Sequence, residues 1–526
     1  MDSNRRLFLK QLGVGAAGLG LLGSLPASVA AASRTGARAP RSTPEAQGVA
    51  SEGVLAFLDA LGQSKHEFHS FMLLRHGHVV AEGWWRPYRS EAPHMMYSLS
   101  KSFTSTAVGL AVAEKRLTVN DRVVSFFPGE LPETVSENLA ALRVKDLLTM
   151  SVGHAKDSTG SLWAEENWVR KFLSLPIEHP PGTVFLYNSG ATYMLSAIVQ
   201  RLTGQKLVDY LQPRLFGPLG IAGISWETCP RGINTGGWGL KIQTEGVAKF
   251  AELYLQKGKW DGKQLLPAAW VEEATTFKIQ QPSPDLERAK KESDWHQGYC
   301  YQFWRCRHNG FRGDGAFGQY AVVMPEQDAV LALTSETSNM QGELNLVWEH
   351  LLPAMKPGVL PAETARQRQL KERLSSLALP LPAGQVSSPV ANRISGRPLE
   401  LKSNEAGVQN VVLRFSGHSC EFSLKDNQGQ YSVHCGLGRW LDGETAMPGT
   451  PPKLTQGKLP SVSKVAAAGA WKDERTFEMV WRYYETPHHD TVTCRFEDDK
   501  VRVEYLDSMT AMNPGRKDKR PALEGA

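Results

Sequence analysis

The alternation of apolar and polar positions predicts a sheet whose strands come from both ends of the first region of the chain. Two partly alternating apolar runs, 71–75 and 79–85, flank a Gly turn and predict a β-hairpin. Strand-like runs return between residues 311 and 336. Helical periodicity lies between them, at 102–115, 192–202 and 243–256. Because strands bound a mainly helical middle, the pattern predicts an α/β fold in which one sheet joins early and late segments.

The pattern changes after about residue 395, where short strands follow one another with few helices. Five strand-like runs lie at 411–415, 420–424, 431–435, 477–481 and 501–505. This spacing is typical of a small β-sandwich or barrel. Before it, a charged helical stretch ends in Pro and Gly, which is typical of a linker. We therefore predict a first domain over 40–356, a helical linker over 357–394 and a C-terminal β-rich accessory domain over 395–526, which contributes no catalytic group.

Composition narrows the class of protein. A chain of 526 residues, of which 41% are hydrophobic, is long enough for two or three domains with their own cores. The net charge of +5 comes from scattered Lys and Arg, which argues against a nucleic-acid partner. The six cysteines fit no zinc spacing, so buried free thiols are the simpler interpretation, although disulfides stay open. A hairpin turn explains the pair His76 and His78, and we expect no metal and no cofactor.

The N-terminal residues are typical of an export signal. Arg5 and Arg6 stand before a moderately apolar, Gly- and Ala-rich run, and small residues follow near 27–32. We interpret residues 1–32 as a cleaved twin-arginine signal, which predicts a periplasmic or extracellular protein. The alternative is an N-terminal membrane anchor, for which this run is short and rich in Gly. No other stretch is long and apolar enough for an integral membrane span.

The most informative motif places Ser98 three residues before Lys101, at the start of a strongly helical run. Positions i and i+3 share one face of a helix, so the Lys side chain can reach the Ser hydroxyl. A Ser hydroxyl needs a neighbouring base to become a nucleophile, and a buried Lys with a lowered pKa can serve. The backbone N–H of a residue at a helix start is also free to stabilise an oxyanion.

The tetrapeptide alone is weak evidence, since about two chance matches are expected in a chain of this length. A second copy runs from Ser461 to Lys464, but no long amphipathic helix follows it. The helical run that follows Ser98 makes it the better candidate nucleophile.

The companions of Ser98 resemble the class C β-lactamase and penicillin-binding-protein-like serine hydrolase family. Residues 181–187 read PG-x-x-F-x-Y and end at Tyr187, which matches the family tyrosine that moves protons with the Lys. The family asparagine falls at Ser189, with Asn188 displaced by one residue. The resemblance therefore implies Tyr187 as a catalytic residue, with Asn188 or Ser189 in substrate binding. The alternative for Tyr187 is a half-buried tyrosine at a strand end.

A later segment, 312–318, resembles the family motif GH-x-G-x-x-G. The resemblance implies that Phe317 donates its backbone N–H to the oxyanion beside that of Ser98. Asp314 and Gly315 would then contact substrate. Asp314 stands where the family has a cation, so a free carboxylate there is expected to disfavour anionic substrates. The equal alternative is that Asp314 pairs with Arg312 on the same strand face.

The resemblance covers about residues 44–355 and implies an α/β (α+β) fold with a mixed antiparallel sheet and a helical subdomain. It further implies an exported serine hydrolase that acts through an acyl-enzyme on a small ester or amide. The alternative is a catalytically inactive penicillin-binding-like protein that binds peptidoglycan or another ligand. Esterases, amidases, D-amino-acid peptidases, β-lactamases and hydrolases of short nylon oligomers share such a site, so the sequence does not choose the substrate. It does not predict the oligomeric state either.

Overall fold

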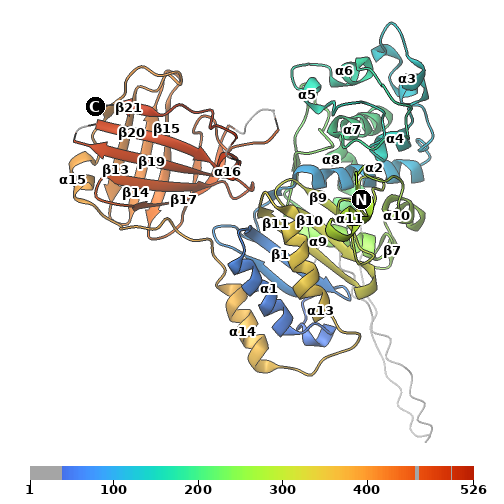
Figure 1. Ribbon diagram of the computed structural model, residues 1–526, viewed down its shortest axis with the longest axis horizontal. Helices are drawn as coiled ribbons and strands as arrows, with labels where there is room; N and C mark the ends of the chain where they lie inside the picture. Colours follow the sequence, from blue (N-terminus) through green and yellow to red (C-terminus); the bar gives the residue numbers. More distant parts are fainter. Residues whose placement is uncertain (1–37, 456–460, 499, 514, 526) are drawn as a thin grey trace, which may run out of the picture.

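A computed structural model describes residues 38–455, 461–498, 500–513 and 515–525 (Figure 1). The predicted export signal, residues 1–32, lies outside the described residues. Within the described ranges, no helix is both long enough and apolar enough to cross a membrane. Two bodies are visible in Figure 1, joined by the chain that follows helix α14 (Thr364–Ser375).

The first body is built on an antiparallel sheet. Among the described residues six strands pair in the order β2-β1-β11-β10-β9-β8. Their bounds are β1 (Glu67–Arg75), β2 (His78–Trp84), β8 (Trp304–Arg305), β9 (Phe311–Gly315), β10 (Gln319–Met324) and β11 (Ala329–Glu336). The predicted hairpin is β1 and β2, and β1 pairs with β11 on its other side. Early and late segments therefore share one sheet, as the pattern predicts.

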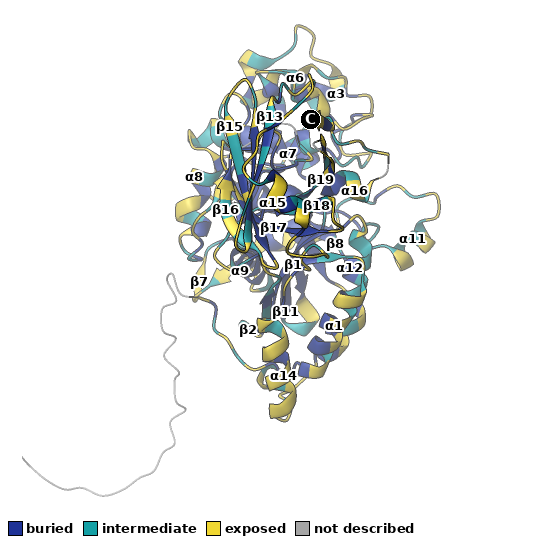
Figure 2. Ribbon diagram, turned by 90° about the vertical axis from the view of Figure 1, so that its left-hand side faces the viewer, coloured by how far each residue is buried: buried dark blue, intermediate teal, exposed yellow. Residues whose placement is uncertain are grey.

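Helices cover both faces of this sheet, because β1 is apolar on both. Phe71 and Leu73 pack into one core cluster, whereas Met72 and Leu74 pack into another. The first face is covered by α1 (Ser51–Gln63), α12 (Met340–Leu346), α13 (Leu352–Ala354) and α14. The second face is covered by α9 (Thr244–Leu255) and α2 (Ser100–Ala113). In Figure 2 the strands are mostly buried, whereas α14 exposes most of its surface to solvent.

A helical subdomain packs against α2 on the side away from the sheet. Its helices are α3 (Glu137–Ala141), α4 (Val144–Leu148), α5 (Thr159–Leu162), α6 (Trp168–Ser174), α7 (Ser189–Thr203) and α8 (Leu207–Leu211). Peripheral elements are α10 (Ala268–Thr275), α11 (Leu286–Glu292) and the short strands β3 (His94–Met95), β4 (Ser225–Trp226), β5 (Leu240–Ile242), β6 (Lys259–Trp260) and β7 (Lys263–Gln264). Helix α7 contacts α2 and α4, so the subdomain borders the start of α2.

The C-terminal body is a nearly closed sheet. Its strands are β12 (Leu399–Glu400), β13 (Asn410–Ser416), β14 (Ser419–Lys425), β15 (Gln430–Leu437), β16 (Leu441–Thr445), β17 (Ser463–Trp471), β18 (Thr476–Arg482), β19 (His489–Glu497), β20 (Lys500–Asp507) and β21 (Leu523–Gly525). Short helices α15 (Pro389–Ile394) and α16 (Ser508–Met512) flank it. A bridge between Leu401 and Gly525 joins the two edges of the sheet. The predicted fold class is therefore confirmed in both bodies.

The structure also shows the surroundings of the second Ser-x-x-Lys copy and of the cysteines. The second Ser-x-x-Lys copy leads into strand β17, where Lys464 is exposed and pairs with Glu444. Ser461 lies in a bend before this strand, so no helix brings the Ser and the Lys of this copy to one face. All six cysteines lie in the described part of the chain, and each is a buried free thiol.

Candidate active site

The predicted nucleophile lies in a tight turn at the entry to α2. Ser98 is the middle residue of a 3₁₀ turn, Tyr97–Leu99, and Tyr97 before it has φ +44°, which is uncommon for a residue with a side chain. The Met96 N–H donates to the Leu240 carbonyl at 2.9 Å, and the Ser100 hydroxyl donates to the Tyr97 carbonyl at 2.6 Å. These bonds hold Ser98 at a helix start, as its motif requires.

Lys101 lies one helical turn further along and is buried. Its Nζ lies 2.9 Å from Ser98 Oγ, 2.9 Å from Ser189 Oγ and 2.8 Å from the Gly237 carbonyl oxygen. Burial lowers the pKa of Lys101 from 10.5 to about 7, although the carboxylates of Asp157 and Asp314 oppose this change. Near neutral pH a large fraction of Lys101 is therefore the free amine, which can accept the Ser98 proton.

The ring of Tyr187 lies against the Lys101 amine. The same ring stacks on Trp304 at 5.6 Å between centroids, and Lys101 Nζ lies 4.8 Å from the Tyr187 ring centre. Burial and the nearby carboxylate of Asp314 raise the pKa of Tyr187 well above its ordinary value, and a hydrogen bond with Ser98 opposes them only in part. The phenol therefore stays protonated, which suits a proton donor better than a base.

The predicted oxyanion residue, Phe317, lies in the turn between β9 and β10. Its backbone has φ +67°, and its carbonyl accepts from the Thr337 N–H at 3.1 Å and the Ser335 hydroxyl at 2.9 Å. Its ring lies 5.5 Å from the ring of Tyr97, the residue before Ser98. The structure thus brings Phe317 to the nucleophile turn.

Gly315 explains how β9 comes so close to this turn. A Cβ on Gly315 would overlap the carbonyl oxygen of Met96 and would lie 3.1 Å from the Leu99 nitrogen. Only a glycine lets the strand pass directly against the backbone that carries Ser98. The contact of Gly315 with substrate stays a prediction.

The neighbours Asn188 and Ser189 differ in their surroundings. Asn188 caps α7: its Oδ1 accepts from the N–H groups of Gly190 and Ala191 and from the Ser158 hydroxyl, and its Nδ2 lies 3.1 Å from His154 Nδ1. Ser189 contacts Lys101 instead. Asn188 therefore supports this loop, and its contact with substrate stays a prediction.

Asp314 forms a buried ion pair within its own strand. Arg312 Nε donates to Asp314 Oδ2 at 2.9 Å, and both side chains are buried. Burial raises the pKa of Asp314, and Arg312 lowers it, the first effect being the larger. Because Arg312 compensates the carboxylate, the expected repulsion of anionic substrates loses its physical basis, and the alternative pairing is the one observed.

Sequence reasoning missed two parts of this group. The Gly237 carbonyl is an acceptor for Lys101, and the Gly-rich run 236–239 was its only signal. Trp304 forms the wall behind Tyr187, together with Tyr299, whose ring lies 6.3 Å from that of Tyr187. Trp304 lies in strand β8, which is too short for its sequence to show an alternation that predicts this contact.

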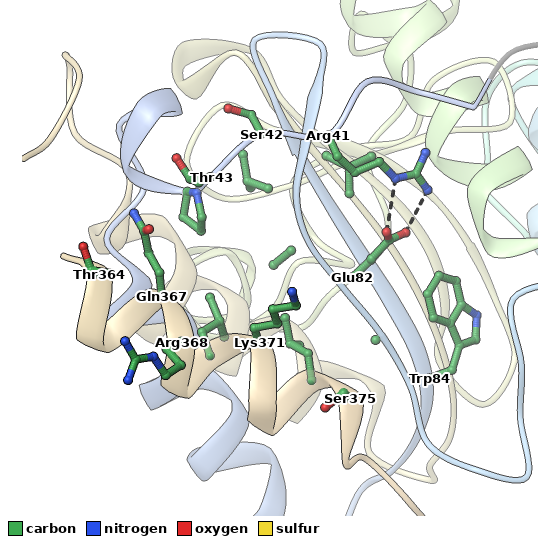
Figure 3. A pocket seen from close by; sticks show the side chains of 17 residues that line it. Arg41, Ser42, Thr43, Glu82, Trp84, Thr364, Gln367, Arg368, Lys371 and Ser375 are labelled. Carbon is green, nitrogen blue, oxygen red and sulfur yellow. Dashed lines mark hydrogen bonds and ion pairs between the residues drawn. The ribbon is translucent and has the colours of Figure 1, made fainter. Parts of the chain in front are cut away.

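A separate cavity of about 760 Å³ lies between β2, α14 and residues 41–44 (Figure 3). Arg41 and Glu82 form an ion pair at its rim, and Gln367 and Lys371 of α14 point toward it. None of the predicted site residues lines this cavity, so it is distinct from the group around Ser98.

Comparison with known proteins agrees with the geometry. Residues 59–353, more than half of the chain, match the family model described as Beta-lactamase. The chain belongs to the Beta-lactamase family. This match confirms the predicted resemblance, and the relatives of the chain include hydrolases.

Two relatives align with this β-lactamase family protein over most of their own length. The 6-aminohexanoate-dimer hydrolase of Paenarthrobacter ureafaciens is 25% identical over 289 residues, which are 51% of this chain and 72% of that protein. Penicillin-binding protein 4 of Amycolatopsis lactamdurans is 27% identical over 274 residues, which are 45% and 70% of the two chains. A solved Bacillus anthracis structure shares the fold at 20% identity, with a TM-score of 0.50 over 63% of this chain and 90% of its own.

Proposed function

We propose that this protein is a serine hydrolase that acts through an acyl-enzyme on small esters or amides. One observation carries the proposal: Lys101 Nζ lies 2.9 Å from Ser98 Oγ, while burial lowers the Lys101 pKa to about 7. A nucleophile and a base within hydrogen-bond reach are the minimum for covalent catalysis. The alternative, a catalytically inactive binding protein, gives no reason for a buried amine held on a serine.

In the proposed reaction, Lys101 and Tyr187 share the proton transfers. Ser98 Oγ attacks the carbonyl carbon of the substrate as Lys101 accepts its proton. The N–H groups of Ser98 and Phe317 stabilise the negative charge that develops on the carbonyl oxygen. Tyr187 then gives its proton to the leaving alcohol or amine and regains one from Lys101. Water releases the acyl group from Ser98 by the same steps in reverse.

Aromatic side chains surround the candidate nucleophile and base. Rings of Tyr187, Trp304 and Tyr299 lie together beside the Lys101 amine. The buried carboxylate of Asp314 already pairs with Arg312. We therefore propose a preference set by shape and apolar contact rather than by substrate charge.

Covalent labelling tests this function. A fluorophosphonate probe should attach to Ser98 in the folded protein, and mass spectrometry of the digested adduct identifies the modified peptide. Ser98→Ala is the control and should remain unlabelled, and Ser461→Ala should label as the unmodified chain does. Folded protein that is not labelled at Ser98 would contradict the proposal.

The rate of labelling should also depend on pH. Since the Lys101 pKa is lowered to about 7, the amine is protonated below this pH and cannot accept the Ser98 proton. We expect the rate to rise by about tenfold per pH unit well below 7 and to level off above it. The rate of fluorophosphonate labelling, measured between about pH 5 and 9, checks this. A flat profile would remove Lys101 as the base.

A further inference from the structure

The C-terminal domain reaches the catalytic domain directly behind the nucleophile turn. The connection is the loop between β18 and β19, residues 483–488. The Glu485 carbonyl accepts from the Met95 N–H at 2.9 Å, and the Tyr88 hydroxyl donates to the Thr486 carbonyl at 3.1 Å. The loop therefore packs on the segment that leads into Ser98.

His488 is the fully buried end of this loop, and both of its ring nitrogens have partners on the other domain. Nδ1 lies 2.5 Å from Glu336 Oε1, and Nε2 lies 2.6 Å from the Tyr97 hydroxyl. Burial raises the pKa of Glu336, but His488 and His489 together hold it at about 2. Glu336 is therefore a carboxylate that only accepts, so Nδ1 carries a proton. The other ring nitrogen, Nε2, forms its hydrogen bond with the Tyr97 hydroxyl.

The same ring touches the oxyanion residue. The His488 and Phe317 rings meet edge to face at 4.8 Å between centroids, and the Tyr97 ring lies 5.8 Å from that of His488. Both partners of the Phe317 carbonyl, Ser335 and Thr337, adjoin Glu336 in the chain. One imidazole thus contacts the residue before Ser98, the residue of the second oxyanion N–H and the strand end that holds that residue.

We propose that His488 is a positioning residue, through which the C-terminal domain sets the two backbone N–H groups of the oxyanion hole. The inference rests on the proposed function of Ser98. Tyr97 has a positive φ, which is strained unless its surroundings hold it, and the His488 bond supplies such a hold. The expectation of an accessory domain without a catalytic group is refined: the domain supplies no reacting group but orients those of its neighbour.

Variants of the full chain test this. His488→Ala should lower kcat for a nitrophenyl ester by about 10- to 30-fold with KM changed less than about threefold, because the oxyanion geometry is looser. Tyr97→Phe removes one oxygen and keeps the ring, so it should fold and show a similar loss. The double variant should be no slower than His488→Ala, because the histidine change already removes the Tyr97–His488 bond that Tyr97→Phe breaks. His488→Gln, whose amide can still form a hydrogen bond with the Tyr97 hydroxyl, should recover most of kcat.

The control breaks another link between the domains. Arg89 and Asp442 form an ion pair at 2.6 Å across the interface, so Asp442→Asn should loosen docking and leave kcat unchanged. An equal loss of kcat in Asp442→Asn would overturn the proposal, as would full kcat in both Tyr97→Phe and His488→Ala. If the unmodified chain is not labelled at Ser98, the proposed function falls together with this inference. If it is labelled and His488→Ala is labelled equally fast, only the inference falls.

Discussion

Replacing Lys101 with methionine should lower the rate of ester hydrolysis by about 10³-fold. Methionine has nearly the length of lysine and suits a buried position, but it cannot accept the Ser98 proton. The Ser98 hydroxyl would then attack without a base, and the partners Ser189 and Gly237 would lose their donor. The measurement is kcat/KM with a nitrophenyl ester, with thermal unfolding followed in parallel so that a loss of fold is recognised.

The control for this change is Lys101→Arg. A guanidinium keeps the positive charge and donates hydrogen bonds, but it does not lose its proton near neutral pH. If Lys101 acts as a base, the arginine variant should be as slow as the methionine variant. If arginine retains a tenth or more of the activity, the positive charge rather than the free amine is what the site requires.

The parts of the site that follow from local geometry could be predicted from the sequence. Ser98 and Lys101 are three residues apart on one helix, and helical spacing alone brings their side chains together. The strand runs of the central sheet were equally visible, because each alternates or is apolar throughout. That early and late strands share one sheet followed from their positions at the two ends of the region.

Other parts of the site depend on tertiary packing, which local sequence patterns do not reveal. Asn188 and Ser189 differ by one position, and the turn before α7 decides which of them faces Lys101. The sequence left Asp314 equally free to face substrate or Arg312, and only the packed strand selects Arg312. The bond between Tyr97 and His488 joins residues 391 positions apart, so no periodicity could reveal it.

Replacing Gly315 with alanine should lower the hydrolysis rate by about 10²- to 10³-fold. The new methyl group would overlap the Met96 carbonyl oxygen, which is backbone and cannot rotate away. Strand β9 or the Ser98 turn must therefore move, and the N–H groups of Ser98 and Phe317 would no longer point at one oxygen. Loss of one oxyanion donor alone accounts for an effect of this size.

The matched control is Gly443→Ala, at a strand glycine in β16 where a Cβ meets nothing within 4 Å. It should leave the rate within about twofold, since a surface change of this kind is close to neutral. The decisive readout is kcat, because a shifted oxyanion hole affects the transition state more than substrate binding. A folded Gly315→Ala protein with unchanged kcat would mean that β9 does not fix the second oxyanion N–H. Phe317 would then lose its assigned role, while Ser98 and Lys101 would keep theirs.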